Sequence, residues 1–341
     1  MAKRFVIKHW WDLALLQGPW LVFLLLGLIL AFLLPIVLNL RPSMAESQAA
    51  LAPAPIDGDR AYGYLKEICK LGPRKAGSET NARQRALVAE HFKKHGATVR
   101  EQQFTGTDPL SGAKVEMANL IGSWFPARTE RVVIGVHYDT RPFPDRDPDP
   151  AKRQTPFLGA NDGASGVALL MEIAQHLNDS TTQWGVDLVL FDGEELVYDQ
   201  TGKYFLGSLE FARVYQSDRK NRRIKTHYVS GLVLDMIGGR DLSIEQEQYS
   251  LQFAPRLVRD VWSVAQKLNA AGFKNRTGKA VLDDHFALND AEIPTIDIID
   301  FDYPFWHTAG DLPEQCSGAS LAQVGRVVTA WLALPKPKTR R

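Results

Sequence analysis

Apolar positions recur along this chain with two spacings, which separate predicted helices from predicted strands. Between residues 163 and 178 they follow the three-four spacing of a helix with one buried face, whereas residues 186–191 and 229–234 are nearly continuous apolar runs, as in strands buried on both faces. The predicted helices are 59–71, 78–94, 163–178, 255–271 and 318–333, and the predicted strands are 98–105, 116–123, 131–137, 186–191, 229–234 and 295–299. This alternation predicts a largely parallel sheet covered by helices.

The amino-terminal part of the chain contains a long uncharged apolar run at residues 19–40. At about 1.5 Å per residue, such a run spans the roughly 30 Å hydrocarbon core of a bilayer. Residues 1–18 are longer than the basic start of a cleavable secretory signal and carry Lys3, Arg4 and Lys8. We therefore expect a retained signal anchor with residues 1–18 in the cytoplasm and the rest of the chain outside it; a cleaved segment would instead give a secreted protein.

Composition changes again after the apolar run. Residues 41–58 are rich in Ala, Pro and Ser and are expected to tether the membrane span to a folded domain at 59–336. Within that domain, residues 141–156 form a Pro- and Asp-rich loop, which is expected at the surface and as a candidate rim of the functional site.

Charge and cysteine content exclude several classes of function. With 40 basic and 39 acidic residues the formal charge is +1, and no long basic run is present, so we expect no nucleic-acid partner. The two cysteines, Cys69 and Cys316, cannot build a framework of several disulfides, and neither has the spacing of a metal site. One bond between them and two free thiols both remain open.

Five short segments place a potential metal ligand or acid-base group where an apolar run ends. They are His137-Tyr138-Asp139, Asn161-Asp162-Gly163, Asp192-Gly193-Glu194-Glu195, Leu234-Asp235-Met236 and Trp306-His307-Thr308. Parallel strands deliver their carboxyl ends to one edge of a sheet, where α/β proteins bind their ligands. Because imidazole nitrogens and carboxylate oxygens are zinc ligands, this ordered set predicts a catalytic zinc site.

Among the five segments, the adjacent pair Glu194 and Glu195 is the strongest indication of a functional site. Adjacent carboxylates behind a buried strand repel each other and lose hydration unless a cation or a shared proton compensates. Successive side chains of an extended chain point apart, so one Glu can bind metal while the other faces the substrate as a general base or acid. Asp162 has a second interpretation as the N-cap of the following helix, and a lone His at a strand end is more often structural.

Seven segments together resemble a known superfamily. They read HYDTRPF, FLGANDGASGVALLMEIAQHL, FDGEEL, LGSLEFA, LDMIGG, LDDHFAL and FWHTAGD, in this order. They are similar to the zinc exopeptidases, a superfamily that contains vibrio-type aminopeptidases and animal glutaminyl cyclases, and the resemblance begins near Asp59. It implies a three-layer α/β/α sandwich around a mixed, mostly parallel sheet, and a zinc enzyme that acts on the amino terminus of peptides.

The resemblance leaves two branches open. In the cyclase branch one zinc is held by Asp162, Glu195 and His307, and Glu194 moves a proton from the α-amine of an amino-terminal Gln to the departing ammonia. In the two-zinc aminopeptidase branch Asp162 bridges the metals, the second site is completed by His137 and Asp235, and Glu194 activates water. A binding ectodomain on a degenerate scaffold is disfavoured, because no ligand position is lost.

Two residues that are not among the proposed metal ligands favour the cyclase branch. Asp283, in Asp283-Asp284-His285, resembles the cyclase acid that shares a proton network with Glu194 and Asp235, and Trp306 resembles the indole that lines the cyclase pocket. Their alternative interpretations are an N-cap for Asp283 and a core aromatic for Trp306.

The chain also departs from animal cyclases. Asp297 replaces a pocket histidine, the stretch 196–205 lacks a pocket tryptophan, and a cysteine pair near His137 is missing. The first interpretation is therefore a membrane-anchored zinc glutaminyl-peptide cyclotransferase with an altered pocket, and the alternative is a zinc aminopeptidase.

Overall fold

The computed structural model describes residues 53–198 and 201–336. The predicted cytoplasmic segment at 1–18, the membrane span at 19–40 and most of the predicted linker lie outside these residues, so they stay predictions. Within the described part of the chain, no helix has the length and apolar character needed to cross a membrane.

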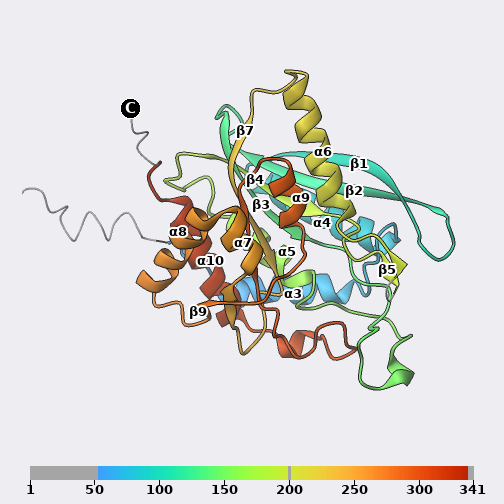
Figure 1. Ribbon diagram of the computed structural model, residues 1–341. Helices are drawn as coiled ribbons and strands as arrows, with labels where there is room; N and C mark the ends of the chain where they lie inside the picture. The colour runs from blue at the N-terminus through green and yellow to red at the C-terminus, as the bar shows by residue number, and fades with distance from the viewer. Residues whose placement is uncertain (1–52, 199–200, 337–341) are drawn as a thin grey trace, which may run out of the picture. The chain divides into compact units, whose positions relative to one another are not determined.

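A six-stranded mixed sheet forms the centre of the domain, in the order β1-β2-β4-β3-β7-β10. Its strands are β1 (Thr98–Thr107), β2 (Lys114–Trp124), β3 (Glu130–His137), β4 (Gly185–Phe191), β7 (His227–Asp235) and β10 (Thr295–Ile299). β3, β4, β7 and β10 run parallel, whereas β2 is antiparallel to both β1 and β4. The four parallel strands therefore deliver their carboxyl ends to one edge of the sheet (Figure 1).

Helices cover both faces of this sheet. The larger layer consists of α3 (Gly58–Lys70), α4 (Glu79–Lys94), α5 (Ala164–Ala174), α8 (Pro255–Lys267) and α10 (Gly318–Leu332), which share one apolar core with strand residues such as Ile134 and Leu188. The opposite face is covered by α6 (Leu206–Lys220) and α9 (His285–Asp290), which pack on Val133 and Val189. Figure 1 shows these two helices on the side of the sheet away from α3 and α5. The predicted α/β/α layering is thus observed.

Local sequence signals account for several helix ends. The Ser78 side chain accepts a hydrogen bond from the Asn81 N–H and caps α4, as predicted. Two predicted helices are shorter than expected: α8 ends at Lys267 because Asn269 adopts a left-handed backbone, and α5 ends at Ala174 rather than at residue 178. Beyond α5, Gln175 and His176 turn back and bind the Glu172 carboxylate.

Several helices and strands of the structure were not predicted from the sequence. They are α6, α9, α7 (Gln248–Phe253), the pair β8 (Ile244–Gln246) and β9 (Phe273–Thr277), and the short pair β5 (Val197–Tyr198) and β6 (Thr201–Gly202). All but α6 are too short to show a period. Cys69 and Cys316 are both buried free thiols, so the bond between them that the sequence left open is not formed.

Candidate functional site

Asp162 lies at the centre of the site, between two histidines. Its Oδ1 is 3.2 Å from Nε2 of His137, the last residue of β3, and its Oδ2 is 3.4 Å from Nε2 of His307. The N-cap position of α5 is occupied by Gly163 and not by Asp162, so the N-cap interpretation of Asp162 is wrong. The two oxygens of one carboxylate thus face two separate groups of ligands.

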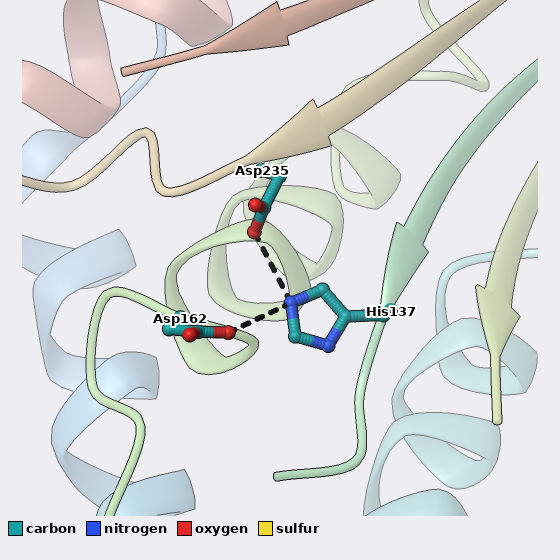
Figure 2. A group of neighbouring side chains, drawn as sticks. All are labelled: His137, Asp162 and Asp235. Carbon is teal, nitrogen blue, oxygen red and sulfur yellow. Dashed lines mark hydrogen bonds and ion pairs between the residues drawn. The ribbon is translucent and has the colours of Figure 1, made fainter. Parts of the chain in front are cut away.

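The first group consists of His137, Asp162 and Asp235, whose ligand atoms all lie within 4.8 Å of one another (Figure 2). The Nε2 atom of His137 is 3.1 Å from Oδ1 of Asp235, the last residue of β7. Figure 2 shows both carboxylates directed at this one ring nitrogen. All three side chains are buried.

The second group consists of Asp162, Glu195 and His307. Nε2 of His307 lies 3.5 Å from Oε1 of Glu195, and all three residues are buried. Among the described residues, both ring nitrogens of His307 and Oδ2 of Asp162 are buried without a hydrogen-bond partner. Buried polar atoms are rarely left unpaired, so this donor set fits a cation that they would coordinate. Three N and O ligands with room for a fourth are typical of catalytic zinc.

Two buried aspartates fasten the segments that carry these ligands. Oδ1 and Oδ2 of Asp139 accept the backbone N–H groups of Glu194 and Glu195, each at 3.0 Å. The carboxylate of Asp311 likewise accepts the N–H of Asn161 at 2.9 Å and that of Asp162 at 3.1 Å. Burial and the charge of Asp162 raise the pKa of Asp311 to about 7. We call each of these carboxylates an aspartate clamp, because it holds the backbone of residues that are distant from it in the sequence: Asp139 holds Glu194 and Glu195, and Asp311 holds Asn161 and Asp162.

Glu194 and Glu195 lie in opposite electrostatic environments. Burial alone would raise the pKa of Glu195, but His307 and Arg141 lower it, and Nη1 of Arg141 lies 2.6 Å from Oε2 of Glu195. Burial raises the pKa of Glu194 well above its usual range; His137 opposes this shift and nearby carboxylates add to it. Glu195 is thus suited to bind a cation, whereas Glu194 is suited to accept and release a proton.

Further buried acids surround Glu194. Asp283, Asp284 and Glu194 form one group whose ligand atoms lie within 4.8 Å of one another, and Asp283 forms another with His285 and Asp297. Burial raises the pKa of Asp283 well above its usual range, and the charge of Asp235 raises it further. The N-cap of α9 is Asp284 and not Asp283, so the N-cap interpretation of Asp283 is wrong as well.

A pocket of about 340 Å³ opens onto both groups. Its lining comprises Arg146, Asp162, Glu194, Glu195, Tyr204, Phe205, Asp235, Met236, Ala280, Val281, Leu282, Asp283, Ile299, Phe301, Trp306 and His307. The Trp306 ring lies 4.8 Å from Phe301 and 4.3 Å from His307, measured between ring centres, and it faces this pocket. All the predicted catalytic and substrate-binding residues therefore line one cavity.

A sequence profile of peptidase family M28 matches residues 119–332, more than half of the chain. The matched region contains His137, Asp162, Glu194, Glu195, Asp235, Asp283 and His307. The chain belongs to peptidase family M28. The suspected zinc exopeptidase superfamily is thereby confirmed.

Solved structures of two kinds resemble this M28 chain. A glutaminyl cyclase from Fimbriiglobus ruber shares 38% sequence identity at a TM-score of 0.80, over 87% of this chain and 100% of that one. A leucine aminopeptidase precursor from Bacteroides thetaiotaomicron shares 33% identity at a TM-score of 0.77, over 84% of this chain and 100% of that one. A glutaminyl-peptide cyclotransferase-like protein of Mus musculus is 23% identical over 85% of this chain and 79% of its own length. This M28 chain is thus an enzyme of that superfamily.

Several residues of the M28 site were not assigned a role from the sequence. Asp139, Arg141 and Asp311 stand in the segments HYDTRPF and FWHTAGD beside the ligands, which was the available signal. Tyr204 and Phe205 line the pocket although the stretch 196–205 has no tryptophan, so other aromatic side chains contribute to the wall here. Asp297, which the resemblance equates with a pocket histidine of animal cyclases, is buried beside Asp283 and does not line the cavity.

Proposed function

We propose that this chain is a zinc-dependent glutaminyl-peptide cyclotransferase, which converts the amino-terminal Gln of a peptide to pyroglutamate and releases ammonia. The observation that carries the proposal is the position of Asp283, which groups with Glu194 on one side and with His285 and Asp297 on the other. A cyclase must accept a proton from an amine and return it to a leaving amine, and a second buried acid beside Glu194 suits that exchange. The likeness to the Fimbriiglobus ruber glutaminyl cyclase supports the same assignment.

The reaction joins the α-amino nitrogen of Gln to its own γ-carbonyl carbon. A C–N bond forms and closes the lactam, the bond to the side-chain amide nitrogen breaks, and the proton lost by the α-amine leaves with ammonia. Glu194 lines the pocket and has a raised pKa, so it is the group that carries this proton. When bound, zinc supplies a Lewis acid that polarises the γ-carbonyl group.

The remaining side chains position these groups. Asp162, Glu195 and His307 would hold the zinc ion, and Arg141 keeps Glu195 ionised for that role. Asp235 and Asp283 flank Glu194 and hold its proton network in place. Trp306 and Phe301 offer flat apolar surfaces to the Gln side chain. The rest of the bound peptide, beyond its first residue, would then extend out of the open side of the pocket.

A zinc aminopeptidase is the second candidate, and a specific observation favours it. The group of His137, Asp162 and Asp235 is complete and has the composition of a second metal site (Figure 2). With two metals, Glu194 would act as the base that activates water for attack on the first peptide bond. The likeness to the leucine aminopeptidase precursor is in keeping with this alternative.

One experiment separates the two candidates. The purified enzyme is incubated with a peptide that begins with Gln, products are identified by mass, and zinc per chain is measured by elemental analysis. A cyclase with one zinc gives a peptide that has lost ammonia and resists Edman sequencing. Release of free Gln by a protein that contains two zinc ions would replace the cyclase proposal with the aminopeptidase.

The location of the enzyme is proposed from the sequence. Residues 19–40 would anchor it in a membrane, with the catalytic domain outside the cytoplasm. Membranes from expressing cells, washed in high salt and then in detergent, test the anchor. Retention through the salt wash is expected; release without detergent would favour a cleaved segment and a secreted enzyme.

A further inference from the structure

The loop at residues 141–156 is fastened to the segment that supplies His307. The backbone N–H of Arg146 donates to the carbonyl oxygen of His307 at 3.1 Å, and Oδ2 of Asp147 accepts the N–H of Ala309 at 2.9 Å. Within the loop, Nε of Arg153 donates to the Asp147 carbonyl at 2.7 Å. The backbone of Arg146 is therefore fixed relative to the metal ligands.

The side chain of Arg146 stacks on the pocket wall. Its guanidinium carbon lies 3.9 Å from the centre of the Trp306 indole, a cation–π contact that orients the guanidinium plane. Among the residues that the structure describes, no carboxylate forms an ion pair with Arg146 and no acceptor takes a hydrogen bond from its side chain. Two N–H groups of a guanidinium can bind the two oxygens of one carboxylate, and the N–H groups of Arg146 are available for this.

Charge is unevenly distributed around the pocket. Five carboxylates, those of Asp162, Glu194, Glu195, Asp235 and Asp283, line its metal-binding part. Arg146 is the only Lys or Arg among the described lining residues, and the Trp306 ring contacts both it and His307.

Much of the remaining lining is apolar and includes Leu282, a residue that is 64% exposed. Lys279 lies over the Phe301 ring, 5.7 Å from its centre, but it forms an ion pair with Asp302. Among the described residues, Arg146 is therefore the positive charge without an ion-pair partner that a ligand beside Trp306 meets.

We propose that Arg146 binds a carboxylate of the substrate peptide that lies just beyond its first residue. This inference rests on the proposed function, because it places the reacting amino terminus at Glu194 and the metal ligands. The carboxylate is either the side chain of Asp or Glu at the second position, or the terminal carboxylate of a dipeptide. The enzyme therefore prefers acidic or very short peptides.

Matched peptides test this preference and separate the two sources of the carboxylate. One pair is Gln-Glu-Phe-Ala amide and Gln-Gln-Phe-Ala amide; the other is the dipeptide Gln-Gln as the free acid and as the amide. For at least one pair the carboxylate form is expected to have a kcat/KM about fivefold to tenfold higher, chiefly through KM. Raising the salt concentration should reduce that ratio.

Variants of Arg146 then assign the preference to this side chain. In Arg146→Gln the ratio should fall to about one, in Arg146→Lys it should persist in part, and Arg146→Glu should reverse it. Arg259→Gln removes a charge from the exposed surface of α8 and serves as the matched control, with an unchanged ratio. If Arg146 only covers Trp306, Arg146→Gln would change both peptides of a pair equally, and an unchanged ratio overturns the inference.

The outcome does not depend on which reaction the enzyme catalyses. Product masses report cyclisation or release of the first residue, and the ratio can be taken from either product. If neither product forms, the proposed function fails, and calorimetric Kd values for the same peptide pairs still give the ratio. A ratio of about one in the wild-type enzyme for both pairs overturns the role of Arg146 alone.

Discussion

Nη1 of Arg141 lies 2.6 Å from Oε2 of Glu195, and both side chains are at most 6% exposed. The opposite oxygen of Glu195 faces His307 at 3.5 Å. One carboxylate therefore joins a fixed positive charge to the proposed metal ligands. Since the charge of Arg141 favours the ionised form of Glu195, it keeps this ligand ready to bind zinc over a wider range of pH.

Replacing Arg141 by Gln is expected to weaken zinc binding in acid. Loss of the guanidinium raises the pKa of Glu195, so protons compete with zinc at a higher pH. The pH at which half of the zinc is released should rise by about one to three units. Zinc retained after dialysis across a pH series measures this change, with Arg259→Gln as control. If the pH of half-release were the same in Arg141→Gln as in the wild type, Arg141 would not control the ionisation of Glu195.

The Glu194→Gln variant is expected to lose turnover while keeping its zinc. An amide cannot carry the proton, and positioned acid-base groups contribute about 10²- to 10⁴-fold to rate. Initial rates with a Gln-initiated peptide and elemental analysis of the same preparation test both points. Glu67→Gln, on the exposed face of α3, is the matched control. Full activity in Glu194→Gln would rule out the proton-transfer role in both candidate reactions.

Asp139→Asn should destabilise the domain and lower activity together. The Asn side chain has one oxygen, so its NH2 group faces one of the two N–H donors of Glu194 and Glu195. The unpaired buried donor costs about 1–3 kcal/mol of the free energy of unfolding. Urea denaturation measures this loss against Asp241→Asn, an exposed site. Equal stability of the two variants would show that the clamp contributes little.

The carboxylate of Glu247 should make stability depend on pH in acid. Burial alone would raise its pKa, but two kinds of neighbour lower it to about 2: the His285 ring, whose Nε2 lies 3.4 Å from Oε2, and the hydrogen-bonding N–H groups of Tyr249, Val281 and Ser250. The folded value lies below the ordinary value of about 4.3, so the ionised group stabilises the fold above that pH. This contribution is lost as the pH falls from there toward 2.

Glu247→Gln tests this dependence. The difference in unfolding free energy between wild type and Glu247→Gln is expected to be about 2 kcal/mol smaller at pH 3 than at pH 7. Urea titrations at both pH values measure it, and Glu67→Gln should show no such change. A constant difference would assign the effect of Glu247 to packing rather than to charge.

His137, Asp235 and the Glu194-Glu195 pair were foreseeable because they lie at or just beyond the carboxyl ends of parallel strands. A histidine or acid at the end of β3, β4 or β7 has to lie at that edge of the sheet, whatever the details of packing. Asp162 and His307 lie in turns away from the strand ends, and only the resemblance of their segments to the superfamily indicated them. Asp139 and Asp311 were not foreseen, because an acid that accepts backbone N–H groups has no spacing of its own. The stacking of Arg146 on Trp306 was hidden as well, since a loop without periodicity gives no indication of which segment it contacts.

The two aspartate clamps also bear on how this enzyme is made. Asp139 is synthesised before its partners Glu194 and Glu195, and Asn161 and Asp162 are synthesised before their partner Asp311. A chain emerging from the ribosome can therefore not complete the site until nearly all of the domain has been synthesised. Zinc capture would then coincide with the last stage of folding, and a truncated chain that lacks Asp311 should neither retain the metal nor persist in the cell.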